Sequence, residues 1–260
     1  MGPADDHLLA ATVAERAGAL LLDVRHSATG DAAGRLGDEG DRRSHELIVA
    51  ALAAARPGDA VLSEEAVHAE GPGASAQDPS AGAGRGSRRV WIVDPLDGTR
   101  EFSEGRVDFA VHVALVVNGR PEAGAVALPA EHLVLSTSDP PSLPPRGRRP
   151  LRILVSRTRP PAEAAAVAAA LDAELVPMGS AGAKTMAVVR GDGDVYLHAG
   201  GQYVWDSAAP VAVALAAGAH ASRLDGSALV YDRPDPWLPD LLICRPELLH
   251  EVLTALRGDP

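Results

Sequence analysis

Two aspartates, Asp94 and Asp97, stand at the end of an apolar run in the stretch VWIVDPLDGTREF, residues 90–102. The run 90–93 predicts a buried strand, and Pro95 restricts the turn between the two carboxylates. Like charges at close range disfavour joint ionisation unless a cation neutralises them. Carboxylate oxygens suit a hard divalent ion such as Mg²⁺ better than Zn²⁺. The stretch therefore predicts a magnesium site.

Two other interpretations fit this stretch when it is taken alone. Asp, Pro and Gly are the usual turn formers, so a plain surface turn explains an isolated copy equally well. Phosphatases of the haloacid dehalogenase type also carry a strand that ends in Asp-x-Asp-Gly-Thr, where the first Asp is a nucleophile. Here two residues, Pro95 and Leu96, separate the aspartates instead of one. That spacing takes the second carboxylate out of the acid–base position and disfavours the nucleophile.

Other polar residues follow further apolar segments. Glu64 and Glu65 come after the short strand predicted at residues 60–62, and Asp206 opens an apolar helix after Trp205. Each is ordinary by itself, because an Asp before an apolar run is usually an N-cap. The glycine-rich turn GSAGAK, residues 179–184, precedes another helix and offers backbone amides to an anion. Together with the Asp-Pro-x-Asp turn, these residues favour one composite site.

The N-terminal part predicts two helices and then strands. Apolar spacing predicts a helix over 5–24, capped by Asp5 or Asp6, and a second helix that follows Asp41 and stops at Pro57-Gly58. The segment between them, 27–41, is predicted as a loop or irregular hairpin. Strands are predicted at 60–62, 90–93, 109–117 and 123–128, with Asn118-Gly119 as a hairpin turn. The Gly-, Ala- and Ser-rich tract 71–87 is predicted to be a mobile loop.

A Pro- and Arg-rich linker is predicted at 138–150. Beyond it, strands at 151–155, 175–176, 195–197 and 241–244 alternate with helices at 160–171, after Gly182 and at 206–217, as is typical of α/β layers. The fold class is therefore predicted as α/β, with an α+β N-terminal half at 1–140 and an α/β C-terminal half at 151–260.

Composition narrows the class of partner. The chain has 260 residues, 46% of them hydrophobic, and a net charge of −11. The negative charge argues against nucleic acid as a partner, because no broad basic face is available for a phosphate backbone. Without an apolar run of spanning length we expect no membrane association, and the single cysteine, Cys244, excludes an internal disulfide. The cytoplasm is the expected location, and the histidines, which show no metal spacing, are expected to be structural.

The motifs together resemble the lithium-sensitive, magnesium-dependent phosphatases of the inositol monophosphatase superfamily, and within it the bacterial 3'(2'),5'-bisphosphate nucleotidases of the CysQ type. The resemblance runs through nearly the whole chain and rests on SEEA at 63–66, VWIVDPLDGTREF at 90–102, GSAGAK at 179–184 and WDSAAP at 205–210. It implies a layered αβαβα sandwich, a cofactor of two or three Mg²⁺ ions, inhibition by Li⁺ and a homodimer.

Carried over by motif, the resemblance also implies roles for single residues. The metal ligands would be Glu64, Asp94, the main-chain carbonyl of Leu96, Asp97 and Asp206, with Glu65 less suited than Glu64. Asp41 and Thr99 would position and deprotonate the attacking water, with Asp38 as the alternative to Asp41. The residues expected to contact substrate are Gly98, Thr99, Arg100, Arg157, Gly182 and Lys184.

The substrate is indicated by the tail of the first motif. Inositol-type members continue the shared Gly-Thr with Thr-Asn-Phe, whereas the nucleotidase type continues with Lys/Arg-Glu-Phe, and this chain has Arg100-Glu101-Phe102. We therefore expect the substrate to be a small nucleotide bisphosphate, 3'-phosphoadenosine 5'-phosphate. We expect 3'-phosphoadenosine 5'-phosphosulfate as a second substrate and a role in sulfur assimilation. The alternatives are an inositol or fructose 1,6-bisphosphate type sugar phosphatase, and a catalytically inactive regulator that binds nucleotide or metal.

Overall fold

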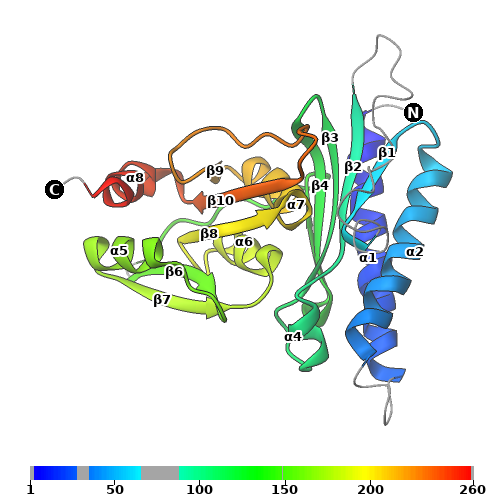
Figure 1. Cartoon of the computed structure of the whole chain (residues 1–260), viewed down its shortest axis with the longest axis horizontal. Helices are drawn as coiled ribbons and strands as arrows, with labels where there is room; N and C mark the ends of the chain where they lie inside the picture. The colour runs from blue at the N-terminus through cyan, green and yellow to red at the C-terminus, as the bar shows by residue number, and fades with distance from the viewer. Residues whose placement is uncertain (1–2, 28–34, 66–87, 148, 259–260) are drawn as a thin grey trace.

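A computed structural model of the chain describes residues 3–27, 35–65, 88–147 and 149–258, in which helices and sheets alternate as five layers (Figure 1). The outermost helices α1 and α2 cover the first sheet, α6 and α7 lie between the two sheets, and α5 and α8 cover the second sheet. The predicted α/β class and αβαβα layering are thus confirmed. In the described part of the chain, no helix has the length and apolar character needed to cross a membrane.

Each sheet has five strands. The first has the order β1-β2-β3-β4-β5, with β1 and β2 parallel and the other neighbours antiparallel. The second has the order β7-β6-β8-β10-β9. The strands are β1 (Ala60–Ser63), β2 (Arg89–Asp97), β3 (Ala110–Val117), β4 (Arg120–Leu128), β5 (Leu133–Ser136), β6 (Leu151–Ser156), β7 (Ala173–Met178), β8 (Val195–Tyr203), β9 (His220–Ser222) and β10 (Trp237–Cys244).

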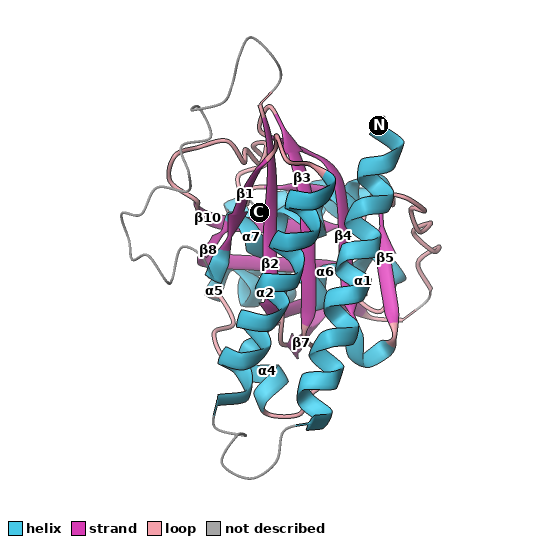
Figure 2. Cartoon of the chain, turned by 90° about the vertical axis from the view of Figure 1, so that its right-hand side faces the viewer, coloured by secondary structure: helices cyan, strands magenta, loops and turns pink. Residues whose placement is uncertain are grey.

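The helices that matter for the site come from both parts of the chain. Figure 2 shows α1 and α2 side by side across the first sheet. On the opposite face of that sheet, α7 packs against β2, β3 and β4. The helices are α1 (Pro3–Ser27), α2 (Leu36–Ala55), the short α4 (Thr99–Ser103), α5 (Ala162–Leu171), α6 (Ala181–Arg190), α7 (Val204–Ala216) and α8 (Leu249–Arg257).

Strand alternation decides which side chains of β2 and β3 reach the site. Trp91 and Val93 pack in the core under α1 and α2, whereas Ile92 faces the core that contains α6 and α7. Successive side chains of a strand point to opposite faces, so Asp94 lies on the same side as Ile92. His112 stands opposite Asp94 on β3, between Ala110 and Ala114, which pack in the same core as Ile92. The site therefore faces the middle helical layer.

Several predicted boundaries were wrong, mostly by a few residues. The first helix begins before Asp5, and α2 begins at Leu36, so Asp41 lies inside this helix and not before it. The second strand of the Asn118-Gly119 hairpin begins at Arg120, and the hairpin turn itself is confirmed by positive φ angles at both of its residues. Among the strands and α-helices, three were missed, β5, β9 and α8; the 3-10 helices Pro129–Glu131 and Pro246–Leu248 were not predicted either. Two of these are strands of three or four residues, too short for a periodic pattern.

Each sheet is built from one side of the predicted linker. Strands β1–β5 lie before residues 138–150 and strands β6–β10 after them, and the described residues of this segment form neither helix nor strand. The exact borders at 140 and 151 remain a prediction. The predicted mobile loop at 71–87 falls outside the described residues.

Candidate active site

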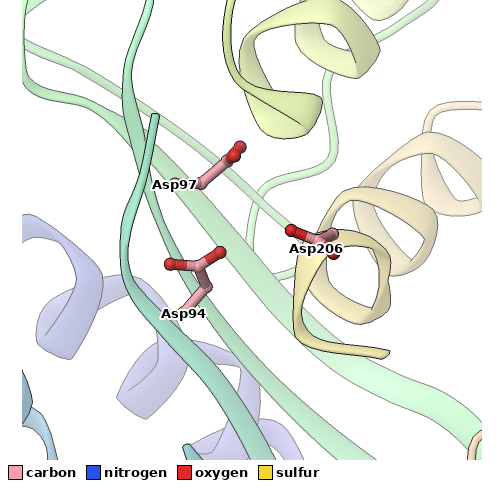
Figure 3. Close-up of side chains that lie close together, drawn as sticks. All are labelled: Asp94, Asp97 and Asp206. Carbon is pink, nitrogen blue, oxygen red and sulfur yellow. The ribbon is translucent and has the colours of Figure 1, made fainter. Parts of the chain in front are cut away.

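Three of the predicted metal ligands meet at one point. One carboxylate oxygen from each of Asp94, Asp97 and Asp206 lies within 4.8 Å of the other two. Figure 3 shows Asp94 and Asp97 projecting from β2 toward Asp206 at the start of α7. Helix α7 therefore places Asp206 at the end of β2, although it follows Asp97 by 109 positions in the sequence (206 − 97). These residues are brought together as predicted.

The turn that carries the aspartates is held by its own backbone. The Asp94 Oδ1 accepts a hydrogen bond from the Leu96 amide at 3.0 Å, and β2 shifts register against β3 between Asp94 and Asp97. Pro95 has no amide to donate to the ladder, so a bulge at this point removes no backbone bond. The bulge turns both carboxylates to the same side, which simple alternation over three residues would not do.

Helix α2 holds this turn from the other side. Glycines at 37 and 40 let α4 approach closely, because a Cβ at Gly37 would lie 2.6 Å from Thr99 Cγ2 and one at Gly40 would lie 3.0 Å from a ring carbon of Phe102. One residue later, Asp41 Oδ2 accepts a hydrogen bond from Thr99 Oγ1 at 3.0 Å. The structure thus pairs Thr99 with Asp41, and Asp38 lies exposed on the first turn of the helix.

Two further contacts complete the hold of α2 on the turn. Ser44 donates to the carbonyl of Pro95 at 2.8 Å, and a ring nitrogen of His45 lies 2.8 Å from the Ser63 hydroxyl at the end of β1. Glu64 follows directly and shares a hydrogen bond with Asp94. The Leu96 carbonyl, a predicted metal ligand, accepts from Thr99 Oγ1 at 3.1 Å. All predicted ligands and both predicted water-positioning groups therefore surround one turn.

Burial and mutual repulsion make this cluster costly without a cation. Burial raises the pKa of Asp41 to about 8, with a contribution from Glu64, and raises the pKa of Asp206 to about 7, with a contribution from Asp97. Burial and the neighbouring carboxylate of Glu64 place the pKa of Asp94 well above its ordinary value. A divalent cation among these groups would favour their ionised form and displace their protons.

Asp97 is the exception within the cluster. Burial by itself would raise its pKa, but the nearby His112 and Lys184 and the Ser180 hydroxyl hold the pKa below its ordinary range. Its Oδ2 accepts hydrogen bonds from Ser180 Oγ at 2.5 Å and from the Gly182 amide at 2.7 Å. Asp97 is therefore ionised before any metal binds and is the anchor of the cluster.

The donor set fits Mg²⁺. The predicted ligands are carboxylates and one carbonyl, all oxygen donors, which Mg²⁺ prefers.

The buried Nε2 of His112 has no aligned hydrogen-bond partner among the described residues, although it lies 3.2 Å from Asp97 Oδ2. The prediction treated every histidine as structural and so missed this contact. No spacing rule could have found it, because His112 reaches the site across the sheet from β3.

Two predicted substrate ligands have other partners. The amide of Gly182, at the N-terminus of α6, donates to Asp97 instead of to an open anion site. Lys184 Nζ is buried and points at three main-chain carbonyls, those of Met178, Gly179 and Ser180, at 3.4, 3.1 and 2.6 Å. An ammonium group has three protons, so these carbonyls engage all of them. The predicted phosphate contacts of Gly182 and Lys184 are therefore not supported by this geometry.

Arg157, a predicted substrate contact, also has protein partners. Its guanidinium donates to Glu101 at 2.9 Å and to Glu104 at 2.8 Å, both near α4. Glu101 is buried and fills the space over Gly179, where a Cβ would lie 2.3 Å from its Cγ. Through Glu101, the Arg-Glu-Phe tail therefore contacts Arg157, which directly follows β6 of the second sheet. Its Arg100 is exposed on α4, beside Gly98 and Thr99.

An aromatic surface next to Asp206 was not predicted. The ring of Tyr203 stacks on buried Trp205 at 4.6 Å between centroids and meets the edge of Trp237 at 5.4 Å. Tyr203 and Trp237 remain 38% and 43% exposed. The Tyr203 amide donates to Asp206 Oδ2 at 2.6 Å, so this surface is directly next to the carboxylate cluster. Tyr203 and Trp205, close to Asp206 in the sequence, were the available signal, whereas Trp237 comes from β10.

Comparison with known proteins agrees with this geometry. A protein of Mycobacterium leprae named 3'-phosphoadenosine 5'-phosphate phosphatase is 49% identical over 265 aligned positions, covering 97% of this chain and 93% of that protein. The Escherichia coli protein named 3'(2'),5'-bisphosphate nucleotidase CysQ is 30% identical over 209, covering 76% of this chain and 80% of that protein. The crystal structure of CysQ from Bacteroides thetaiotaomicron is 26% identical, with a TM-score of 0.77, and covers 93% of this chain and 97% of that one.

The family assignment rests on the whole length of the chain. The inositol monophosphatase family model matches residues 6–141 and 148–259, which include every carboxylate of the cluster described above. The CysQ structure shares the fold over nearly all of both chains. The chain belongs to the inositol monophosphatase family.

Proposed function

We propose that the protein is a Mg²⁺-dependent phosphatase that removes the 3'-phosphate of 3'-phosphoadenosine 5'-phosphate, and that it also acts on the 5'-phosphosulfate. The observation that carries the proposal is the cluster of Asp94, Asp97 and Asp206 beside the Asp41–Thr99 pair. The substrate is supported by the name of the M. leprae relative and by the Arg-Glu-Phe tail.

The residues divide the chemistry between them. Glu64, Asp94, Asp97, Asp206 and the Leu96 carbonyl would hold two or three Mg²⁺ ions. Such ions neutralise phosphoryl oxygens, lower the pKa of bound water and stabilise the leaving oxygen. The protein's own part is to bring negatively charged groups together before the substrate arrives, which α2 and α7 do from opposite sides of β2.

Asp41 and Thr99 are proposed to position the attacking water. Thr99 Oγ1 lies 3.0 Å from Asp41 Oδ2 and so aligns the hydroxyl with the carboxylate. Burial raises the pKa of Asp41 to about 8 in the metal-free protein, and a divalent cation nearby would favour its ionised form, which can accept a proton from water. We expect Thr99→Val to lower kcat about 100-fold with little change in KM, as measured by phosphate release, because general acid–base catalysis contributes about that factor.

The phosphate groups of the nucleotide need hydrogen-bond donors and positive charge, whereas its adenine base needs an apolar stacking surface. We propose that the amides of Gly98 and Thr99 and the exposed Arg100 bind the phosphate groups, since Arg157 is paired with Glu101 and Glu104. The exposed aromatic surface of Tyr203 and Trp237 offers a stacking face for adenine. Tyr203→Ala should then raise KM for the nucleotide and leave hydrolysis of p-nitrophenyl phosphate unchanged.

A substrate panel tests the proposal. Release of phosphate from 3'-phosphoadenosine 5'-phosphate, inositol 1-phosphate and fructose 1,6-bisphosphate is measured side by side with Mg²⁺. We expect the nucleotide to have the highest kcat/KM. Preference for a sugar phosphate would support the second candidate, an inositol or fructose 1,6-bisphosphate type phosphatase. Tight nucleotide binding without turnover would support the inactive regulator, which the complete carboxylate set disfavours.

The remaining expectations follow from the resemblance. We propose that Li⁺ inhibits the reaction and that the protein acts in the cytoplasm as a homodimer, without nucleic acid or membrane as a partner. Phosphate release at increasing LiCl, with KCl as the ionic-strength control, measures the first. Light scattering after size exclusion measures the mass of the protein against the 26.8 kDa of one chain.

A further inference from the structure

His112 occupies a wholly buried position between the two sources of carboxylates. It lies on β3 opposite Asp94, and its Nδ1 is 3.0 Å from the carbonyl oxygen of Trp205, the residue before Asp206. A carbonyl only accepts hydrogen bonds, so Nδ1 is the donor at this end, and Nε2 attracts the Asp97 oxygen when it is protonated as well. One end of the ring is therefore tied to the start of α7.

The other end of the ring lies against Asp97. Nε2 is 3.2 Å from Oδ2, the same oxygen that accepts from Ser180 Oγ and from the Gly182 amide. Three groups from β3 and from the start of α6 thus surround one oxygen of Asp97. The second oxygen is the one that none of these three groups contacts. The carboxylate is held in a single orientation by groups that are outside the carboxylate cluster.

Gly182 makes this arrangement possible. A Cβ at position 182 would lie 2.1 Å from His112 Nε2, well inside van der Waals contact. The residue predicted for phosphate binding is therefore needed as glycine because the imidazole fills the space of its missing side chain. The ring and Gly182 form one packed unit beside Asp97.

We infer that His112 is a positioning residue for the metal site, whose ring spans from the Trp205 carbonyl to the Asp97 carboxylate and so fixes Asp97 relative to Asp206. The inference rests on the proposed function, because it assumes a divalent metal at these carboxylates. Partners of this kind, which touch a ligand and not the metal, commonly change metal affinity by 10- to 100-fold when removed.

Two amide variants separate the two ends of the ring. His112→Asn keeps a polar atom at the place of Nδ1 but cannot reach Asp97, whereas His112→Gln places its amide nitrogen where Nε2 lies. Mg²⁺ binding to the EDTA-treated full chain is measured by titration calorimetry. We expect H112N to bind Mg²⁺ at least tenfold more weakly than the parent and H112Q at least threefold more tightly than H112N.

Controls distinguish positioning from loss of packing. His198→Asn removes a second partly buried histidine, which bonds the Gly201 carbonyl at 2.8 Å, and should leave Mg²⁺ affinity unchanged. Gly182→Ala keeps His112 but displaces its ring, and should weaken Mg²⁺ binding about tenfold even if H112N does not fold. In all variants the Mg²⁺ concentration that half-saturates phosphate release should shift with the calorimetric affinity.

The outcomes are distinct. Parent-like Mg²⁺ affinity in H112N or G182A, or equal weakening in H112N and H112Q, would overturn the positioning role while leaving the proposed function intact. Absence of Mg²⁺ binding by the parent itself would instead remove the metal site on which the proposed function depends.

Discussion

Removal of divalent metal should make the protein less stable as the pH rises from 6.5 to 8. In the metal-free structure, burial raises the pKa of Asp41 to about 8 and that of Asp206 to about 7. The ordinary value for an aspartate is about 3.9, which applies in the unfolded chain. Between these values the folded state holds a proton that the unfolded state has lost. Stability therefore falls as the pH rises through this window.

The size of the effect follows from the number of protons. One proton held only by the folded state changes the unfolding free energy by about 1.4 kcal/mol per pH unit. Over 1.5 pH units Asp41 contributes roughly 2 kcal/mol, because it stays largely protonated until pH 8. Asp206 adds a smaller part, since it loses its proton near pH 7. A fall of about 2 kcal/mol lowers Tm by roughly 4–8 °C in a chain of this size.

The other groups with shifted pKa values do not reverse the sign in this window. Burial lowers the pKa of Lys184 to about 8, which favours folding as the pH rises, but the folded state loses this proton only near the upper end of the window. Burial lowers the pKa of His198 and His220, which favours folding as the pH rises, but this acts mainly below about 6.5, where the unfolded histidines gain protons. For His112 burial also lowers the pKa, but Asp97 outweighs it and the net direction is upward. Its contribution therefore has the same sign as that of Asp41.

Thermal unfolding in EDTA at pH 6.5, 7.25 and 8.0 measures the slope. Asp41→Asn should reduce it by at least half, whereas Asp38→Asn, on the exposed first turn of the same helix, should leave it unchanged. Saturating Mg²⁺ should raise Tm more at pH 8 than at pH 6.5, because binding to these carboxyls releases protons. A Tm that is constant or rises with pH in EDTA would refute the reasoning.

Three substitutions give further expectations. Asp94→Asn should abolish Mg²⁺-dependent phosphate release. The metal-free variant should melt no lower than the parent, because Asn keeps the oxygen that accepts from the Leu96 amide and removes a carboxyl whose ionisation burial and its neighbours oppose; a lower Tm in EDTA or retained turnover would contradict this. Glu101→Gln should lower the unfolding free energy by about 1 kcal/mol in urea titrations, because it weakens the hydrogen bond from Arg157 to buried Glu101, and a parent-like value would contradict this. Asp6→Asn should lower the unfolding free energy by about 3 kcal/mol in urea titrations, because buried Asp6 pairs with Arg56 at 2.6 Å; a loss below 1 kcal/mol would count against it.

Local pattern was enough to predict the layers and the residues of the carboxylate cluster. Each of these motifs consists of consecutive residues, so it can be recognised from the sequence alone: the apolar run at 90–93, the Asp-Pro-x-Asp turn and the Trp-Asp pair. Their meeting point could be predicted because they match the motifs of one family. The start of α2 was missed, because its glycines at 37 and 40 lower helix propensity and read as a loop. In the fold, Gly37 and Gly40 lie where α2 and α4 approach each other closely.

By itself, the sequence determined which residues carry charge and where strands and helices alternate. Only the tertiary structure decided which partner each charge has. Gly182 and Lys184 read as anion binders, yet the Gly182 amide is bound by Asp97 and Lys184 by main-chain carbonyls. Arg157 is bound by two glutamates, and His112 reaches the site across a sheet. Hydrogen bonds and ion pairs form between groups that packing brings within about 3 Å, and that proximity is a property of the whole fold and not of spacing along the chain.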